Sequence, residues 1–465
     1  YEATATTLRS GMRVCGPGDI TGDGYEDMLV SCAHYTGVPA TNVGKILLFK
    51  GSASGIDNIP DGSYIGTYSN GQFGYYIAGL GDVNGDGIND FATGEPGYDN
   101  GQTDEGRIFV FYGASPAPSA TPSWTFENDI AFAKLAKVAG KGDINNDGYN
   151  DMICSAPAFV GGMEGGRAYV FYGSATGLAT TPGWVKSGMA SADYYGQSIS
   201  IAGNLNGDQF DDVVVSTSEF DDVLNEVGRV DIFYGKASGI TVDASVSIIG
   251  DTIEKGISGG TPIGDFNGDG YDDIIYGTRS LFDFIEAYSF PVNMRFYITN
   301  GSSAGISDKY SYITNPFDHF GGSGGAYSAG DINGDGFGDF YINAPGGDLR
   351  FGKGDVTYST EGFQSVGMVC IYYGSASSCS PITSLSLVAA TTSSLTLTCA
   401  SDPFIEHYDL RYKKTGVATW TYISSATNSI TLTGLLSCTS YEMQMQSFCN
   451  SGGAAWSPLQ TFTTT

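Results

Sequence analysis

Short runs in which apolar and polar residues alternate recur along most of the chain, and glycine-rich turns separate them. In each recurring unit, one apolar run precedes an acidic segment, a second follows it, and a third carries alternating aromatics such as Phe109, Phe111 and Tyr112. A fourth, more variable run lies near Trp124 or Trp184. Alternation with a period of two between glycine-rich turns predicts antiparallel β-strands. Four such strands in each unit of about sixty residues predict the blades of a β-propeller.

The acidic segments supply the strongest repeat signal. The segment GDITGDGYED (18–27) recurs as GDVNGDGIND (81–90), GDINNDGYND (142–151), GNLNGDQFDD (203–212), GDFNGDGYDD (264–273) and GDINGDGFGD (330–339). We call these loops 1 to 6 and number each from its second residue, at 19, 82, 143, 204, 265 and 331, so that successive loops are 63, 61, 61, 61 and 66 residues apart. One match would be an ordinary turn, but such regular spacing predicts repeated structural units with a shared function.

The spacing of oxygen-bearing residues in these loops predicts calcium sites. Ca²⁺ takes six to eight oxygen ligands, and side chains at positions 1, 3, 5 and 9 with the backbone carbonyl at position 7 can converge on one ion. Glycine at position 6 permits the sharp turn that this convergence requires. About six ions are expected, and the predicted ligands are Asp19, Thr21, Asp23, Tyr25 and Asp27; Asp82, Asn84, Asp86, Ile88 and Asp90; Asp143, Asn145, Asp147, Tyr149 and Asp151; Asn204, Asn206, Asp208, Phe210 and Asp212; Asp265, Asn267, Asp269, Tyr271 and Asp273; and Asp331, Asn333, Asp335, Phe337 and Asp339.

Loop 4 departs from the pattern at two positions. Asn204 replaces the first aspartate, and Gln209 occupies the glycine position. The loop loses one formal charge and must place a residue with a side chain in a glycine conformation, which costs about 1 kcal/mol. We therefore expect the fourth calcium site to be the weakest.

The loops do not fit an EF-hand, which needs a bidentate glutamate at position 12. That position holds strand-forming residues instead, namely Val30, Thr93, Cys154, Val215, Tyr276 and Ile342. The ions are therefore expected to lie between β-strands, where they would stabilise the scaffold.

The composition of the chain argues against several classes of function. The chain has 465 residues, 68 glycines and a formal net charge of −29, which disfavours nucleic acid and anionic lipid as partners. No run of about 18 apolar residues occurs, so direct membrane insertion is not expected. Only three histidines are present, and neither a Cys-His nor a Ser-His arrangement is indicated.

The eight cysteines suit an oxidising compartment. Cys15 and Cys32 flank loop 1 on strands expected to pair, which makes a local disulfide one possibility. Cys399 and Cys449 end two other predicted strands that are able to face each other. The sequence does not determine the pairing.

The repeats resemble the FG-GAP repeats of integrin α-subunits over residues 1–375. The calcium loops carry most of the resemblance, together with aromatic-glycine pairs such as Phe73-Gly74 and Tyr195-Gly196, and a looser Phe132-Ala133 in the third unit. The resemblance implies a secreted or cell-surface protein whose calcium loops lie on the face opposite the ligand surface. Six blades are favoured, with a strand in residues 1–8 closing the ring; a missing N-terminal blade, which would make seven, is the alternative.

The repeat ends before a small polar linker, residues 376–380, and residues 381–465 resemble a fibronectin type III domain, a β-sandwich. Leu395–Cys399 resembles its strand B, Tyr408–Tyr412 its strand C, and the segment from Leu435 to Tyr441 its tyrosine corner. The usual role of such a domain is that of a spacer or interaction module.

These features predict a non-catalytic, extracellular, calcium-stabilised adhesion or ligand-binding module whose partner is an extracellular protein or glycan. The alternatives are lectin-like glycan binding, and accessory domains of a secreted hydrolase whose catalytic part is not in this chain. Extra residues within 346–366 and an aromatic segment at 280–290 suggest a ligand surface, since long loops on rigid scaffolds often bind partners. These two segments could instead pack on each other or on the C-terminal domain. The candidate ligand contacts are Phe282, Phe284, Tyr288, Arg350, Phe351 and Lys353.

Overall fold

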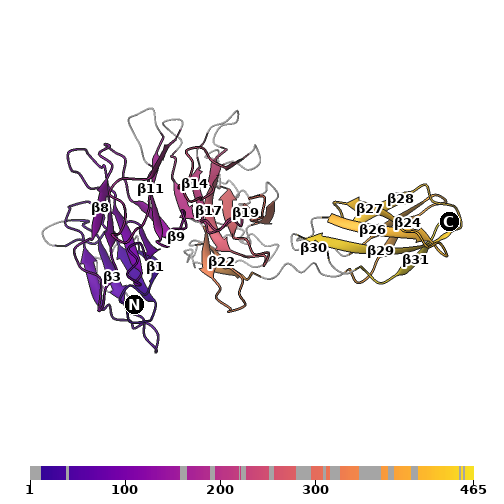
Figure 1. Ribbon diagram of the computed structural model, residues 1–465, viewed down its shortest axis with the longest axis horizontal. Coiled ribbons are helices and arrows are strands. Elements are labelled where there is room, and N and C mark those ends of the chain that lie inside the picture. The colour runs from indigo at the N-terminus through magenta and orange to yellow at the C-terminus, as the bar shows by residue number, and fades with distance from the viewer. Residues whose placement is uncertain are drawn as a thin grey trace, which may run out of the picture. The chain divides into compact units, whose positions relative to one another are not determined.

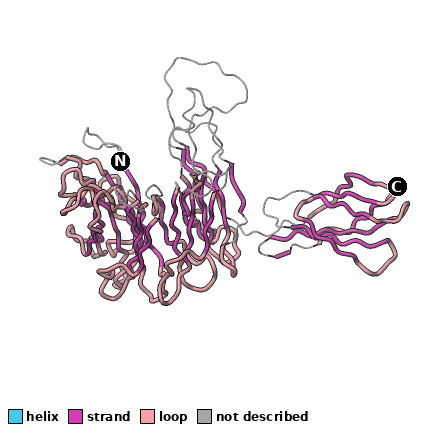
Figure 2. The backbone as a smooth tube through the Cα atoms, turned by 90° about the horizontal axis from the view of Figure 1, so that it is seen from above, coloured by secondary structure: helices cyan, strands magenta, loops and turns pink. Residues whose placement is uncertain are grey.

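The computed structural model describes residues 12–37, 41–157, 165–188, 194–218, 220, 227–250, 256–278, 295–306, 310–314, 325–344, 368–374, 382–399, 407–449, 452–453 and 456–465. Within these ranges every regular element is a β-strand, as Figure 2 shows, and no helix could cross a membrane. The chain divides into two compact units. The first comprises Tyr1–Gly264, Tyr271–Gly330 and Asp339–Tyr372, and the second comprises Asp265–Gly270, Asp331–Gly338 and Tyr373–Thr465.

The first unit is a series of antiparallel sheets whose strands follow one another in sequence order. In the described residues, five of these sheets have four strands and one has three. Their strands are β1 (Met12–Gly18), β2 (Asp27–Cys32), β3 (Lys45–Phe49) and β4 (Gly62–Ile65); β5 (Ile77–Gly81), β6 (Asp90–Glu95), β7 (Arg107–Phe111) and β8 (Trp124–Glu127); β9 (Lys137–Gly142), β10 (Asp151–Ala156), β11 (Arg167–Phe171) and β12 (Trp184–Ser187); β13 (Ser198–Ile201), β14 (Val213–Thr217), β15 (Arg229–Phe233) and β16 (Val246–Ile249); β17 (Ile257–Gly264), β18 (Asp273–Thr278), β19 (Arg295–Thr299) and β20 (Tyr310–Thr314); and β21 (Ala326–Gly330), β22 (Asp339–Ala344) and β23 (Met368–Tyr372).

The sheets are the blades of a β-propeller, as the sequence pattern predicted. The first strands of successive sheets adjoin in the order β1, β5, β9, β13, β17 and β21. Figure 1 shows the sheets of this unit in chain order, from the indigo strands β1 and β3 to the orange strand β22. The apolar core lies between neighbouring sheets; Leu29 and Leu48 of the first sheet, for example, share a cluster with Phe91 and Phe111 of the second. Residues 1–8, expected to close the ring, lie outside the described residues, so the six-blade closure stays a prediction.

Aromatic residues just after the third strands connect the second, third and fourth blades to the blades that follow them. The Tyr112 hydroxyl accepts a hydrogen bond from the Leu178 N–H at 3.2 Å, and Tyr172 and Tyr234 do the same further along the chain. The Trp124 Nε1–H donates to the Ala179 carbonyl at 3.1 Å. The aromatic pattern read from the sequence therefore reflects contacts between blades as well as packing within them.

The aromatic-glycine pairs also mark contacts between blades. Phe73 forms an isolated parallel bridge with Gly44, whose φ is +81°, and a Cβ on Gly44 would lie 1.9 Å from the Phe73 carbonyl oxygen. In the third unit the equivalent bridge joins Gly106 to Leu135, while Phe132 is 44% exposed. The expected Phe132-Ala133 pair is therefore misplaced by three residues, because Leu135 takes the buried position that Phe73 and Tyr195 occupy in two other units.

The expected local disulfide in the first blade does not form. Cys15 lies opposite Leu29 and Cys32 opposite Met12, and both cysteines are free thiols. The two residues are therefore offset by three positions along paired strands, about 10 Å, which exceeds the span of a disulfide. Cys399, one of the two cysteines on strands that the sequence allowed to face each other, is likewise a free thiol.

The second unit contains a β-sandwich. One sheet has the order β24 (Ser386–Ala390), β25 (Ser394–Thr398) and β28 (Ser429–Thr433). The other is built from β27 (Thr421–Ser425), β26 (His407–Lys414), β29 (Ser440–Cys449) and β30 (Gly452–Gly453), with β31 (Gln460–Thr463) also paired to β29. Alternate residues of both sheets form one core, which includes Leu395, Leu397, Leu410, Met443 and Met445.

Candidate metal centre

Each acidic loop connects the first strand of a sheet to the second along the chain. In every loop except loop 4, position 9 is the first residue of the second strand. Position 12 lies inside that strand in all six units, which agrees with the exclusion of an EF-hand. The antiparallel pairing of the two strands brings both ends of each loop together.

The residue at position 1 organises the loop backbone. In loop 1, Asp19 Oδ1 accepts a hydrogen bond from the Gly22 N–H and Oδ2 accepts one from the Gly24 N–H, each at 2.7 Å. Asp82 accepts the same pair of bonds from Gly85 and Gly87 at 2.6 and 2.7 Å. These bonds curl the backbone around the first carboxylate, so that positions 1 to 6 form one compact turn.

Positions 3 and 5 add further oxygens to the turn. In loop 2, Asn84 Oδ1 accepts a bond from the Asp86 N–H at 3.0 Å, and Asp86 Oδ1 accepts one from the Ile88 N–H at 2.9 Å. In loop 1 the residue at position 3 is Thr21, whose Oγ1 is buried and forms no hydrogen bond of good geometry, but lies near enough to Asp27 to lower the pKa of that carboxyl group. A buried oxygen at a predicted ligand position, with a carboxylate beside it, fits the donor set of a metal ion.

The aspartate at position 9 is buried and links the loop to two parts of the blade. Asp90 is 0% exposed; its Oδ2 accepts a bond from the Val83 N–H at 2.9 Å and its Oδ1 accepts one from the Gly113 N–H at 2.8 Å. Asp151 and Asp212 repeat both contacts. Burial raises the pKa of these three carboxyl groups to about 7, although the backbone hydrogen bonds oppose the shift.

The carboxylates of loops 1 to 3 have no basic partner. No lysine or arginine forms an ion pair with any of them in the part of the chain that the structure describes. Each loop thus gathers three carboxylates and further uncharged oxygens without a neutralising side chain. An all-oxygen, anionic donor set is what a hard cation such as Ca²⁺ requires.

Loop 4 keeps the turn but loses part of its organisation. Gln209 adopts φ +75°, the left-handed conformation that glycine takes in the other loops. Asn204 Oδ1 still accepts a bond from the Gly207 N–H at 2.7 Å, but its amide nitrogen cannot accept the second bond. Among the described contacts, the Gln209 N–H accordingly donates no bond to Asn204.

In loops 5 and 6, the residues Asp265–Gly270 and Asp331–Gly338 belong to the second unit, and they form the same turn within themselves. Asp265 accepts bonds from Gly268 and Gly270 at 2.6 and 2.8 Å. Asp331 accepts bonds from Gly334 and Gly336 at 2.7 and 2.8 Å. The pair of bonds to position 1 is thus shared by loops 1, 2, 5 and 6, while loop 3 keeps the bond from Gly148 to Asp143 at 2.8 Å and loop 4 the bond from Gly207 to Asn204.

Successive loops are joined by backbone hydrogen bonds. The N–H at position 8 of each later loop donates to the carbonyl at position 1 of the preceding loop, as Asn89 does to Asp19 at 3.0 Å. The remaining bonds join Asn150 to Asp82, Asp211 to Asp143, Asp272 to Asn204 and Gly338 to Asp265, at 3.0 to 3.2 Å. In the middle of the series the position-8 side chain bonds back as well, with Asp211 Oδ2 accepting from the Asp143 N–H at 2.7 Å.

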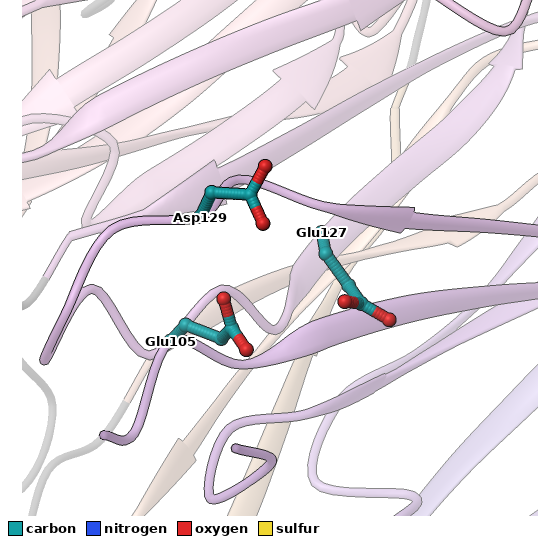
Figure 3. A group of neighbouring side chains, drawn as sticks. All are labelled: Glu105, Glu127 and Asp129. Carbon is teal, nitrogen blue, oxygen red and sulfur yellow. The ribbon is translucent and has the colours of Figure 1, made fainter. Parts of the chain in front are cut away.

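The structure also contains a second acidic cluster, a candidate cation site that the sequence did not predict. Glu105, Glu127 and Asp129 place one oxygen each within 4.8 Å of the others. Figure 3 shows the three side chains near one another; Glu105 precedes β7, whereas Glu127 and Asp129 both come from the end of β8. Burial raises the pKa of Glu105, and the charges of Glu127 and Asp129 raise it further. The detectable signal was a glutamate where other units have Val43, Gly165 and Val227 just before the conserved glycine.

The six residues proposed as ligand contacts cannot be placed. Phe282, Phe284, Tyr288, Arg350, Phe351 and Lys353 all lie outside the described residues.

Comparison with known proteins supports the assignment of the repeats. The FG-GAP repeat family matches residues 74–111 and 323–360. Integrin alpha-PS2 of Drosophila melanogaster is 32% identical over 227 residues, which are 44% of this chain and 15% of that protein. Integrin alpha-5 of Xenopus laevis is 27% identical over 45% of this chain and 20% of its own length.

A relative of another kind is phosphatidylinositol-glycan-specific phospholipase D of Rattus norvegicus. It is 29% identical over 169 residues, which are 34% of this chain and 20% of that protein. The matches thus span a fifth or less of each relative's length. Together with the fold, they support an integrin-like FG-GAP domain in this chain.

Proposed function

We propose that this chain is an extracellular, calcium-stabilised module for adhesion or ligand binding, and that it does not itself catalyse a reaction. The observation that carries the proposal is the set of repeated loops that gather carboxylates; in the described residues those of loops 1 to 3 form no ion pair with a lysine or arginine. The integrin α relatives favour an extracellular or cell-surface location and a binding role.

Calcium would be held by the side chains at positions 1, 3, 5 and 9 and by the carbonyl at position 7. Its contribution would be to neutralise the gathered carboxylates and so stabilise the connection between the first two strands of each blade. An ion that binds only the folded chain stabilises it by mass action, by about 2.7 kcal/mol per site at a free concentration of 100 times Kd. The ions are therefore scaffold components in this proposal.

Thermal unfolding tests the calcium role. The melting temperature of the propeller should fall by many degrees when Ca²⁺ is replaced by excess chelator, and protease cleavage should become faster. The β-sandwich supplies an internal control, because peptides from residues 407–449 should keep their hydrogen-exchange protection in chelator. A propeller melt that is unchanged by chelation would refute the calcium proposal.

We also propose that the C-terminal sandwich is a fibronectin type III-like spacer or interaction module. Strands β24, β25 and β28 form one sheet, while β27, β26, β29 and β31 pair in the other, which supports this topology. The Tyr441 hydroxyl accepts a hydrogen bond from the Leu436 N–H at 2.9 Å, as a tyrosine corner requires.

The partner would be an extracellular protein or a glycan. A glycan array and a pull-down from extracellular extracts, each run in Ca²⁺ and in chelator, distinguish a lectin-like role from protein recognition. Once a ligand is found, the double variant Phe284→Ala and Phe351→Ala should weaken its binding without changing the melting temperature. Full affinity in that variant would place the ligand surface elsewhere.

A second candidate is an accessory region of a secreted hydrolase, which the phospholipase D relative favours. The length and domain content of the native polypeptide, determined by mass spectrometry of the protein from its source, distinguish the two candidates. A longer native chain with a hydrolase domain would support the second candidate, whereas ligand capture by the chain described here supports the first.

A further inference from the structure

The cluster of Glu105, Glu127 and Asp129 lies at the end of the second blade away from loop 2. Glu105 comes two residues before β7, Glu127 ends β8, and Asp129 follows it. Because neighbouring strands of the blade are antiparallel, the β6–β7 and β8–β9 connections leave the sheet at the end opposite the β5–β6 connection. Loop 2 occupies the β5–β6 connection, so this cluster is separate from the acidic loops.

Glu105 is a buried carboxylate with one unpaired oxygen. Its side chain is 0% exposed, and Oε1 accepts a hydrogen bond from the Asn100 N–H. Oε2 is buried and has no hydrogen-bond partner among the described residues. A buried charged oxygen without a partner is strongly unfavourable, so the atom requires either a proton or a cation.

The nearby basic side chains do not meet this need. The Arg107 guanidinium bonds to Glu95 Oε2 at 3.1 Å and lies 3.7 Å from Glu127 Oε1. The Lys134 ammonium lies 4.0 Å from Asp104. Within the described part of the chain, neither cation forms an ion pair with Glu105 or Asp129.

The fold does not require an acid at these places. The residues equivalent to Glu105 in the first and fourth blades are Val43 and Val227, which are 3% and 0% exposed. Glu127 pairs with Arg107 across the strands, and the matching partners in those two blades are Ile65 and Ile249. Apolar residues therefore serve the same structural positions in the first and fourth blades, so the fold of a blade does not by itself call for this acidic set.

The geometry suits one ion. Oxygens bound to Ca²⁺ lie at about 2.3–2.6 Å from it, so two ligands of the same ion are separated by no more than about 5 Å. One oxygen from each of the three carboxylates falls within 4.8 Å of the others. We propose that Glu105, Glu127 and Asp129 bind a hard divalent cation of the Ca²⁺ class at the end of the second blade opposite the acidic loops.

Equilibrium dialysis of the full chain against Ca²⁺ tests this site by counting bound ions. Glu105→Gln keeps the size of the side chain and removes its charge, so it should bind one Ca²⁺ fewer per chain than the unaltered protein. Asp129→Asn changes an exposed residue and should weaken one class of site at least tenfold, while the melting temperature in chelator stays the same.

Asp104→Asn is the matched control, because Asp104 is adjacent in sequence but contacts Lys134 instead of the cluster. It should bind the same number of ions as the unaltered protein. If both Glu105→Gln and Asp129→Asn also bind that number with unchanged affinity, the proposal is wrong and Glu105 is simply protonated. Should Glu105→Gln fail to fold, the Asp129→Asn result decides. The count does not depend on the acidic loops, because it is the difference between variants.

Discussion

Two substitutions in loop 2 separate the structural role of a carboxylate from its proposed calcium role. Asp90→Ala removes the acceptor of two buried backbone hydrogen bonds, from Val83 and Gly113. Each buried N–H left unpaired costs about 1–3 kcal/mol, so this variant should lose about 2–6 kcal/mol of stability even without calcium. Asp86→Ala changes an exposed residue, and in chelator its effect should stay within about 0.5 kcal/mol.

Calcium should turn the small effect of Asp86→Ala on stability into a large one. At saturating Ca²⁺, loss of one site at 100 times its Kd removes about 2.7 kcal/mol, so Asp86→Ala should be clearly destabilised. Urea unfolding of both variants, followed by tryptophan fluorescence in Ca²⁺ and in chelator, measures the four values needed. Equal effects of Asp86→Ala in the two conditions would show that loop 2 has no energetic coupling to calcium. A mild effect of Asp90→Ala in chelator would refute the hydrogen-bond argument.

Three further outcomes are expected. Gln209→Gly should raise the urea midpoint in Ca²⁺, because it relieves about 1 kcal/mol of left-handed strain in loop 4; an unchanged or lower midpoint contradicts the strain argument. In chelator, acidification from pH 7 to about 4 should stabilise the propeller, because burial raises the pKa of the position-9 carboxyl groups of loops 2 to 4 to about 7, well above their unfolded values. Their stabilisation is complete below the unfolded pKa and is lost as the pH rises through the folded pKa, so the urea midpoint should fall between pH 4 and 7, and less steeply in Asp90→Asn. Tyr441→Phe should destabilise the sandwich by about 1–3 kcal/mol through loss of the bond to Leu436, with a propeller melt equal to that of the unaltered chain.

The propeller and its acidic loops could be predicted because repetition makes a weak local pattern reliable. One Asp-rich turn has many explanations, whereas six at near-constant spacing indicate one structural unit. The contact of Tyr441 with the turn before it was also predictable, since the two are close in sequence and the Leu436 N–H donates to the Tyr441 hydroxyl.

Features that depend on strand register were harder to predict. The offset between Cys15 and Cys32 follows from the pairing of β1 with β2, which includes an irregularity between Cys15 and Gly18. Likewise, Leu135 fills a place that Phe73 and Tyr195 hold in two other blades, so the nearby Phe132 matched the aromatic pattern although it lies three residues away. The Glu105 cluster was missed because its members meet only when β7 pairs with β8.

The backbone hydrogen bonds between successive loops affect how easily the number of repeat units in such a chain can change. Each junction uses an N–H and a carbonyl, and even Gly338, which has no side chain, makes the bond to Asp265. A unit therefore recognises its neighbour through groups that every residue except proline carries. Duplication or deletion of a whole unit would leave an equivalent junction behind it, and only the curvature needed to close the ring would have to adjust. The number of blades can thus vary among related chains while each junction between loops stays the same.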